Sequence, residues 1–436
     1  MRKLILAFAL LALGGLTQAQ VTLNYWLWDA NQLAPYQQCV ADFEAANPGV
    51  SVRVSQTGWG DYWTALTTGF VAGTAPDVFT NHLQQYPTFV EMEQLVDIGP
   101  LIERDGIDVD IYLEGLADLW VRDGARYGLP KDWDTIAIVY NQTMTAAAGI
   151  SDAEMRALTW NASDGGTFQE VAARLTLDRH GNDALSPDFD RNNVVQHGYS
   201  FAYDGAGAGY GQTEWSHFAV STGWAFNDGI WGSAYYYDDP RFIATIDWLA
   251  RLMRDLRVMP SFSDISALGG NSLFYAGQVA MLTDGSWMIG GHADNAPFDV
   301  GFAPLPIGPE GRKSMFNGLA DSIWVGTRHQ EEAWQLVKHL ASPACQEVVG
   351  AAGVVFPAVP SAVDLALATF AERGLDVSAY TEQALAEGGT FLFPITDNAA
   401  EINSIMQAAL SSVLLGQQSA EAALTRANQD VNALFR

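Results

Sequence analysis

The sequence predicts an α/β protein of more than one domain, in which doubly wound sheets are flanked by helices. Strand and helix patterns alternate as β-α-β-α-β along the first part of the chain, which is typical of a parallel sheet covered by helices. The chain has 436 residues, too many for one compact domain, and 49% of them are apolar, enough for packed cores. No flexible linker interrupts it, so the strands themselves are expected to carry the chain between domains.

The first unit alternates apolar, β-rich segments with amphipathic ones. The expected strands are 21–28, 50–54 and 76–80, and the expected helices are 34–47, 61–72 and 86–94. Asn47-Pro48-Gly49 ends the first helix and Gly73 ends the second, because Pro and Gly interrupt a helical pattern. This order predicts a parallel sheet.

A second unit of similar character begins near Tyr127. Its expected elements are strands at 135–141, 299–305 and 322–326, helices at 242–256, 271–279 and 330–340, and an almost wholly helical end from 362 to 436. The stretch 179–213 is rich in Gly, Asp and Asn and has little periodicity. We therefore expect a long loop or insertion there.

Residues 1–19 have the pattern of a secretory signal peptide. Arg2 and Lys3 precede an apolar run from Leu4 to Leu16, and Ala19 ends a segment of small residues suited to cleavage. The residue directly after that position is Gln20 and not a cysteine, so a lipid anchor is not expected. The mature protein is expected to be periplasmic or secreted.

Composition excludes several function classes. The 50 acidic and 22 basic residues give a net charge of −28, which disfavours a nucleic-acid partner. The seven His residues form no zinc pattern, and neither a nucleophile elbow nor a nucleotide loop is present, so no cofactor or metal is expected. Asp188, Asp190 and Asn192 have the spacing of a calcium loop, but the Gly and Glu of an EF-hand are missing. A solvated turn is the favoured interpretation.

The aromatic residues carry more information. The chain has 14 Trp, and several lie beside carboxylates in strand-end or loop positions. These motifs are Trp28-Asp29, Trp59-Gly60-Asp61, Asp132-Trp133-Asp134 and Asp284-Gly285-Ser286-Trp287. A sugar stacks its C–H face on an indole and bonds its hydroxyls to Asp and Asn, and ligands of open α/β sheets lie beyond the strand ends. The pattern predicts a carbohydrate site.

Several short motifs also occur in a fixed order over most of the chain. They are the segments 43–50 (F-E-x-x-N-P), 73–79 (G-x-x-P-D-V), 127–130 with 139–141, and 274–281 followed by Gly285-Ser286-Trp287. Together they resemble the bacterial extracellular solute-binding proteins of sugar ABC transporters, the maltose-binding-protein-like family. The insertion at 179–213 departs from the family's pattern and is expected either to shape the cleft or to bind calcium.

The resemblance implies a two-lobed periplasmic-binding-protein fold with three hinge crossings. The crossings would lie near 132–135, 297–305 and 353–358, the N-lobe in 20–131 and 301–352, and the C-lobe in 136–296 and 357–436. Cys39 and Cys345 would then share a lobe, which favours a disulfide over two separate thiols without deciding between them. The function implied is that of a monomeric receptor without a cofactor. It would close over a mono- to trisaccharide or a glycoside and deliver it to the permease of an ABC importer.

The expected ligand contacts come from both lobes and from the hinges. They are Trp28, Asp29, Asp61, Asn81, His82 and Asn317 from the N-lobe, Lys131, Asp132 and Trp133 at the first hinge, Trp224, Asp284 and Trp287 from the C-lobe, and Phe356 at the third hinge. Lys131 and Asp132 have an alternative role as a salt bridge that sets the hinge geometry. Two other functions stay open: a receptor for a polyamine or another small cationic or polar solute, and a secreted glycoside hydrolase with two cleft carboxylates.

Overall fold

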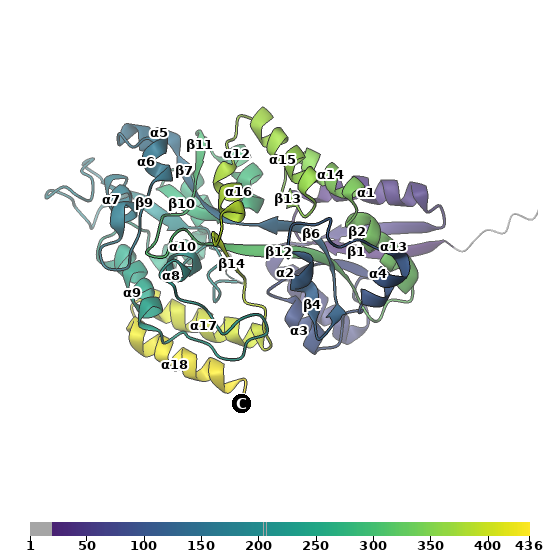
Figure 1. Cartoon of the computed structure of the whole chain (residues 1–436). Helices are drawn as coiled ribbons and strands as arrows, with labels where there is room; N and C mark the ends of the chain where they lie inside the picture. Colours follow the sequence, from purple (N-terminus) through teal and green to yellow (C-terminus); the bar gives the residue numbers. More distant parts are fainter. Residues whose placement is uncertain (1–19, 204, 206) are drawn as a thin grey trace, which may run out of the picture.

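The computed structural model describes residues 20–203, 205 and 207–436, and shows two α/β lobes side by side (Figure 1). The expected signal peptide at 1–19 lies outside the described residues. Among the described residues, none of the helices combines the length and the apolar character needed to cross a membrane.

The sheet of the first lobe has the strand order β13-β6-β12-β3-β1-β2, with β14 beside the start of β12, within the described chain. The strands are β1 (Val21–Leu27), β2 (Val50–Gln56), β3 (Val78–His82), β6 (Leu129–Asp134), β12 (Ser314–Ile323), β13 (Phe356–Pro357) and β14 (Thr390–Leu392). β1 pairs in parallel with β2 and β3, but β12 runs antiparallel to β3 and β6. The prediction of a parallel sheet from the first three strands is therefore confirmed, and β12 adds an antiparallel neighbour because it returns from the other lobe in the opposite direction.

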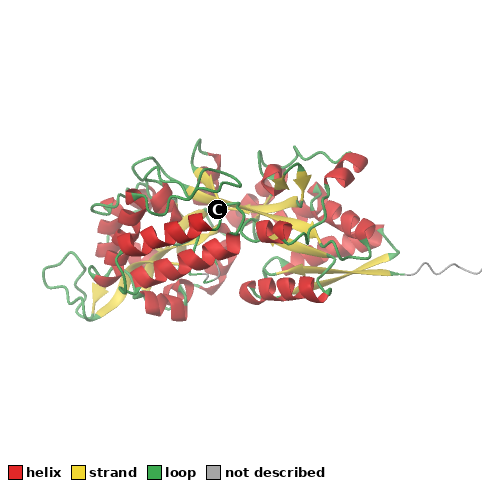
Figure 2. Cartoon of the chain, turned by 90° about the horizontal axis from the view of Figure 1, so that it is seen from below, coloured by secondary structure: helices red, strands yellow, loops and turns green. Residues whose placement is uncertain are grey.

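Helices cover both faces of this sheet (Figure 2). They are α1 (Leu33–Ala46), α2 (Trp59–Ala72), α3 (Tyr86–Glu91), α4 (Gly99–Asp105), α13 (Gln330–Leu340), α14 (Pro343–Ala352) and α15 (Pro360–Glu372), with the short hairpin β4 (Val121–Arg122) and β5 (Ala125–Arg126) nearby. Gly73 ends α2 at a φ of 70°, a left-handed conformation that glycine adopts without strain. Cys39 of α1 and Cys345 of α14 form a disulfide with a Cα–Cα distance of 5.3 Å.

The sheet of the second lobe has the order β11-β7-β10-β9-β8. Its strands are β7 (Ile136–Asn141), β8 (Leu177–Asp178), β9 (Val194–Phe201), β10 (Val279–Gly285) and β11 (Val300–Ala303). β9 lies within the stretch expected to be a loop, so that prediction is wrong for residues 194–201. The helix expected at 271–279 is present as α11 (Gly270–Tyr275), but it ends before β10 begins at Val279. β10 is buried along its whole length, and such a strand lacks the alternation that marks a half-exposed one.

The helices of the second lobe include the last two of the chain, which pack on α9. They are α5 (Gln142–Ala147), α6 (Asp152–Arg156), α7 (Gly166–Arg174), α8 (Ser216–Val220), α9 (Pro240–Arg254), α10 (Phe262–Leu268), α11 (Gly270–Tyr275), α12 (Ile289–Asn295), α16 (Ser378–Leu385), α17 (Ala399–Leu414) and α18 (Ala420–Ala433). Asp239 caps α9 by accepting a hydrogen bond from the Arg241 backbone, and Pro240 occupies its first turn.

Between β1 and α16, the described chain passes between the two lobes at three places. Thr135 separates β6 from β7, and the segment 304–313 leads from β11 to β12. Residues 301–303, placed in the N-lobe by the resemblance, belong to the second sheet because β11 pairs with β7. β13 pairs with β6, and α15 packs against α14 and β13, so the chain returns to the second lobe only after α15. The third crossing is later than the expected 353–358.

Candidate ligand-binding site

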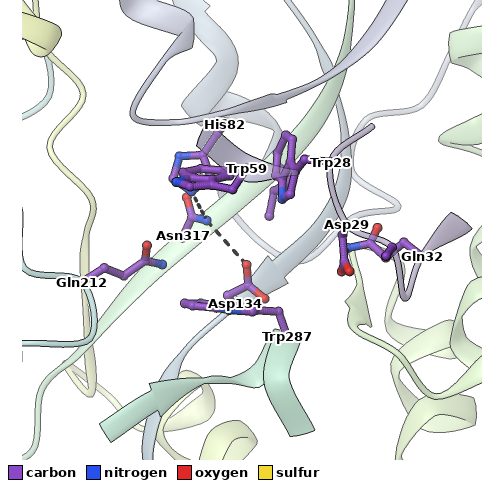
Figure 3. A pocket seen from close by; sticks show the side chains of 11 residues that line it. Trp28, Asp29, Gln32, Trp59, His82, Asp134, Gln212, Trp287 and Asn317 are labelled. Atoms are coloured by element: carbon purple, nitrogen blue, oxygen red, sulfur yellow. Dashed lines mark hydrogen bonds between the residues drawn. The ribbon is translucent and has the colours of Figure 1, made fainter. Parts of the chain in front are cut away.

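A cavity of about 350 Å³ lies between the two lobes (Figure 3). Its lining residues are Trp28, Asp29, Ala30, Gln32, Trp59, His82, Asp134, Asn317 and Leu319 from the first lobe, and Gln212 and Trp287 from the second. The first-lobe residues follow or end the strands β1, β3 and β6, lie in the middle of β12, or begin α2. This is the strand-end position where α/β proteins bind ligands, and the volume suits a small one.

Indole rings form the opposite walls of the cavity. Trp28 and Trp59 meet edge to face at 5.1 Å between ring centroids, and Trp59 lies 5.2 Å from the ring of His82. Trp287 faces them from the second lobe (Figure 3). These three indoles are half-buried, so a planar apolar ligand can reach them.

Gly285 makes room for Trp287. The indole folds back over the end of β10, and a Cβ atom at Gly285 would lie 2.0 Å from the ring atom Cζ3. Any residue with a side chain at this position would therefore displace the ring. The Gly-Ser-Trp sequence after β10 positions the second-lobe wall.

A chain of hydrogen bonds crosses the floor of the cavity. The side-chain nitrogen of Asn317 lies 2.8 Å from Nε2 of His82 and 3.5 Å from a carboxylate oxygen of Asp134. The Ser286 hydroxyl donates to the other oxygen of Asp134 at 3.1 Å. Burial lowers the pKa of His82 to about 3, so its ring is neutral and can accept from Asn317. Both lobes thus contribute to the floor.

Three polar atoms of the lining have no hydrogen-bond partner among the described residues. They are Oδ1 of Asn317, Nε2 of Gln212 and Nε1 of Trp59. Buried polar atoms are nearly always paired, and leaving one unpaired costs about 1–3 kcal/mol. These atoms offer one acceptor and two donors to a bound molecule.

The carboxylates around the cavity are hard to ionise. Burial raises the pKa of Asp29, although hydrogen bonds from the Asn31 backbone and the Gln32 side chain oppose the shift. Burial also raises the pKa of Asp134 well above its ordinary value, and the nearby charge of Asp132 adds to the effect. For Asp132 itself, burial raises the pKa to about 6 against the opposing charge of Lys131.

Lys131 and Asp132 lie beneath the cavity rather than in its wall. The Lys131 ammonium donates to Oε1 of Gln32, lies 3.4 Å from a carboxylate oxygen of Asp132 and stands 4.1 Å over the ring of Tyr36. Gln32 also donates to Asp29, so it links this buried pair to the lining. The structure favours the salt-bridge interpretation of Lys131 and Asp132.

The structure brings together five of the expected ligand contacts. Trp28, Asp29, His82, Asn317 and Trp287 all line the cavity. The other eight lie outside its lining: Asp61, Asn81, Lys131, Asp132, Trp133, Trp224, Asp284 and Phe356.

Packing explains where those other residues lie. Trp133 is stacked between Phe316 and Phe356, at 5.8 and 4.9 Å between centroids, inside the first lobe. Trp224 is stacked on Phe242 at 4.4 Å in the core of the second lobe.

The polar residues outside the lining are engaged elsewhere. Asp284 is buried and bonded to His292 at 2.9 Å. Asn81 donates to the Ser322 hydroxyl within the first sheet. Asp61 is exposed in the first turn of α2, where a carboxylate favours the helix dipole.

Sequence reasoning missed Ala30, Gln32, Trp59, Asp134, Gln212 and Leu319. Trp59 and Asp134 belong to motifs that the sequence singled out, but the expected contacts from these motifs were Asp61 in the first and Asp132 with Trp133 in the second. Gln212 comes from the end of the irregular stretch after β9, where no local pattern indicates orientation.

The segment with the spacing of a calcium loop, residues 188–192, forms a turn that is held by local hydrogen bonds. Asp190 accepts from the Asn192 backbone at 3.2 Å and from the Asn193 side chain at 2.7 Å. Across the described residues, no group of three or more His, Cys, Asp or Glu side chains is placed to hold a metal ion. The segment has the contacts of an Asx turn.

The sequence matches the model of the family described as bacterial extracellular solute-binding protein over residues 29–347. Among solved structures, UspC from Mycobacterium tuberculosis is 27% identical, with a TM-score of 0.73 over 95% of this chain and 100% of that one. Lmo0181 from Listeria monocytogenes, solved with cycloalternan, is 20% identical, with a TM-score of 0.80 over 95% and 99%. The GacH receptor of Streptomyces glaucescens, solved unliganded and with acarbose, is 18% identical, with a TM-score of 0.76 over 95% and 98%. The last two likenesses show the shared two-lobed fold.

Proposed function

Because this chain belongs to the bacterial extracellular solute-binding proteins, we propose that it is the receptor component of an ABC importer and captures a carbohydrate between its lobes. One observation carries the choice of ligand class. The interlobe cavity combines half-buried indoles on opposite walls with unpaired polar atoms between them. Stacking on the indoles suits the C–H face of a sugar, and the polar atoms suit its hydroxyls.

The neighbouring structures support this ligand class. Lmo0181 and GacH share the fold and are solved with the carbohydrates cycloalternan and acarbose. A cavity of about 350 Å³ is suited to a ligand of one or two sugar rings, so a mono- or disaccharide is favoured within the expected range.

The closed conformation of the two lobes would tell the permease that the receptor has bound its ligand. The ligand contacts Trp28 and Trp59 on one lobe and Trp287 on the other, so it favours the conformation that brings both walls together. A permease that recognises the closed form would then receive the sugar. In this role the protein acts as an exported monomer and performs no chemical step.

Isothermal titration calorimetry against neutral, amino and acidic mono- and disaccharides tests the proposal. We expect at least one carbohydrate to bind at micromolar concentration or below, with loss of affinity in Trp287→Ala. Binding of a polyamine with no binding across the sugar panel would reject the carbohydrate proposal. Turnover of aryl glycosides, abolished by Asp134→Asn, would show that the protein is a hydrolase instead.

A further inference from the structure

The lining of the cavity contains two carboxyl groups and no cationic side chain. Asp29 and Asp134 line it, whereas no Lys or Arg does. Its one basic side chain, His82, is neutral because burial lowers its pKa to about 3. The charge of Asp29 is partly offset by Lys131, which reaches toward it through Gln32.

Asp134 has no such compensation. Its partners are the neutral Ser286 hydroxyl and the Asn317 amide, and no Lys, Arg or His lies within salt-bridge distance of it in the described chain. The carboxylate of Asp132 increases the local negative charge, and the Asp134 residue is 4% exposed. A buried carboxylate is costly unless a cation accompanies it. A positively charged group on the ligand would supply the cation that Asp134 lacks among its described partners.

The surroundings of Asp134 also suit a positively charged group. Oδ1 of Asn317, in a side chain that is 1% exposed, is an unpaired acceptor beside it. Trp287 lines the same cavity as Asp134, and in the view of Figure 3 its indole is drawn below the Asp134 carboxyl. An ammonium group donates three hydrogen bonds, accepts none, and is attracted to the face of an indole. The Asp134 carboxyl, Oδ1 of Asn317 and the Trp287 indole therefore all suit an ammonium group of the ligand.

We propose that the preferred ligand is a carbohydrate with a protonated amino group, which binds between Asp134 and Oδ1 of Asn317 beside the Trp287 ring. The inference rests on the proposed sugar-receptor function. The indoles on both walls account for the sugar ring, and Asp134 accounts for the amine. A polyamine would satisfy the carboxylate but offers no flat C–H face to the indoles.

Matched sugar pairs test this inference by calorimetry at pH 6.5. Each pair compares an amino sugar with its neutral parent. The pairs are glucosamine and glucose, galactosamine and galactose, and the β-1,4 disaccharide of glucosamine and cellobiose. We expect at least one amino sugar to bind 100-fold more tightly than its parent. A neutral parent that binds as tightly as every amino sugar overturns this inference and leaves the sugar-receptor function standing. Failure of every sugar to bind overturns the sugar-receptor function itself.

The variant Asp134→Asn removes the charge and keeps the shape. It should lose 30-fold or more in affinity for the amino sugar and change less than 3-fold for the neutral parent. Asp61→Asn, an exposed position outside the cavity, is the matched control and should leave both affinities unchanged. Equal losses for the amino sugar and its parent would show that Asp134 only supports the cavity shape, which overturns the inference. Thermal melting of each variant verifies folding.

Proton release is a second readout that a purely structural role would not produce. Burial raises the pKa of Asp134 in the empty protein, and an ammonium group beside it would lower that pKa. Binding of the amino sugar should therefore release protons, seen as a dependence of the heat on the ionisation enthalpy of the buffer. This dependence should disappear in Asp134→Asn.

Discussion

The guanidinium group of Arg122 lies 4.5 Å from the ring centroid of Trp231, and the two residues come from different lobes. Arg122 belongs to β4, beside the first lobe, and also pairs with the carboxylate of Asp397 in the second. Trp231 holds a positive φ of 58°, and its indole donates to the backbone oxygen of Val121 at 3.3 Å. These contacts join the lobes away from the ligand cavity.

Arg122→Ala should therefore shift the protein toward an open conformation. The cation–π contact and the ion pair are partly exposed, so we expect a loss of about 1 kcal/mol, or roughly 5-fold in ligand affinity. Small-angle X-ray scattering should show a larger radius of gyration. Arg104→Ala is the control, because Arg104 pairs only with Asp105 and Glu331 inside the first lobe. Equal effects in both variants would argue against a role of the interlobe contact.

Trp287→Ala should weaken binding of the sugar selected by the panel by about 10- to 100-fold, because stacking on one wall is lost. Trp224→Phe is its control, since Trp224 is stacked on Phe242 in the core. That variant should lower the melting temperature and leave the dissociation constant unchanged. Calorimetry and thermal denaturation separate the two effects, and a stronger affinity loss in Trp224→Phe would place the ligand elsewhere.

Gly285→Ala tests how Trp287 is positioned. The added Cβ would overlap the indole, so the ring must leave its place and affinity should fall about as far as in Trp287→Ala, roughly 10-fold or more. Gly58→Ala, just before Trp59, has no atom within 4 Å of the added Cβ and should bind normally. Tryptophan fluorescence should report the moved ring. Normal binding by Gly285→Ala would show that Trp287 is not a ligand contact.

The Asp132 carboxyl should make stability depend on pH. Its pKa is raised from the ordinary 3.8 to about 6 on folding, so the folded state holds this proton more tightly than the unfolded chain. The contribution to stability is present below about pH 4 and is lost as the pH rises through 6, by up to about 3 kcal/mol. Asp132→Asn should flatten this part of the profile in urea denaturation. If Asp132→Asn and the unsubstituted protein show the same dependence of stability on pH, the raised pKa of Asp132 is refuted.

Removal of the disulfide should affect stability and leave binding intact. Cys39 and Cys345 are 306 residues apart in sequence and both lie in helices of the first lobe. The double variant with Ala at both positions should lose about 3–5 kcal/mol of unfolding free energy because the unfolded chain is no longer constrained. The dissociation constant should not change, since neither residue lines the cavity. Unchanged stability would mean that the covalent link contributes nothing.

The sequence predicts local helices and strands better than it predicts strand pairing and side-chain packing between residues that are distant in sequence. The helix expected at 330–340 has those bounds in the structure, because its apolar face and its flanking residues are local signals. β9 and β10 were missed because central strands take their identity from neighbours distant in sequence. The same limit applies to the site. Trp28 and Asp29 could be found because they lie at the end of a predicted strand, but nothing near Trp224 in sequence reveals that Phe242 covers it.

The strand order also determines which of the two sheets can be completed first as the chain is made. All strands of the second sheet come from one continuous stretch, residues 136–303. The first sheet needs β12 between β3 and β6, and β12 is synthesised only after that whole stretch. During synthesis from the N-terminus, β3 and β6 therefore wait with unpaired edges while the other lobe assembles, and such edges favour aggregation. The sheet that begins the chain is therefore the sheet that is completed last.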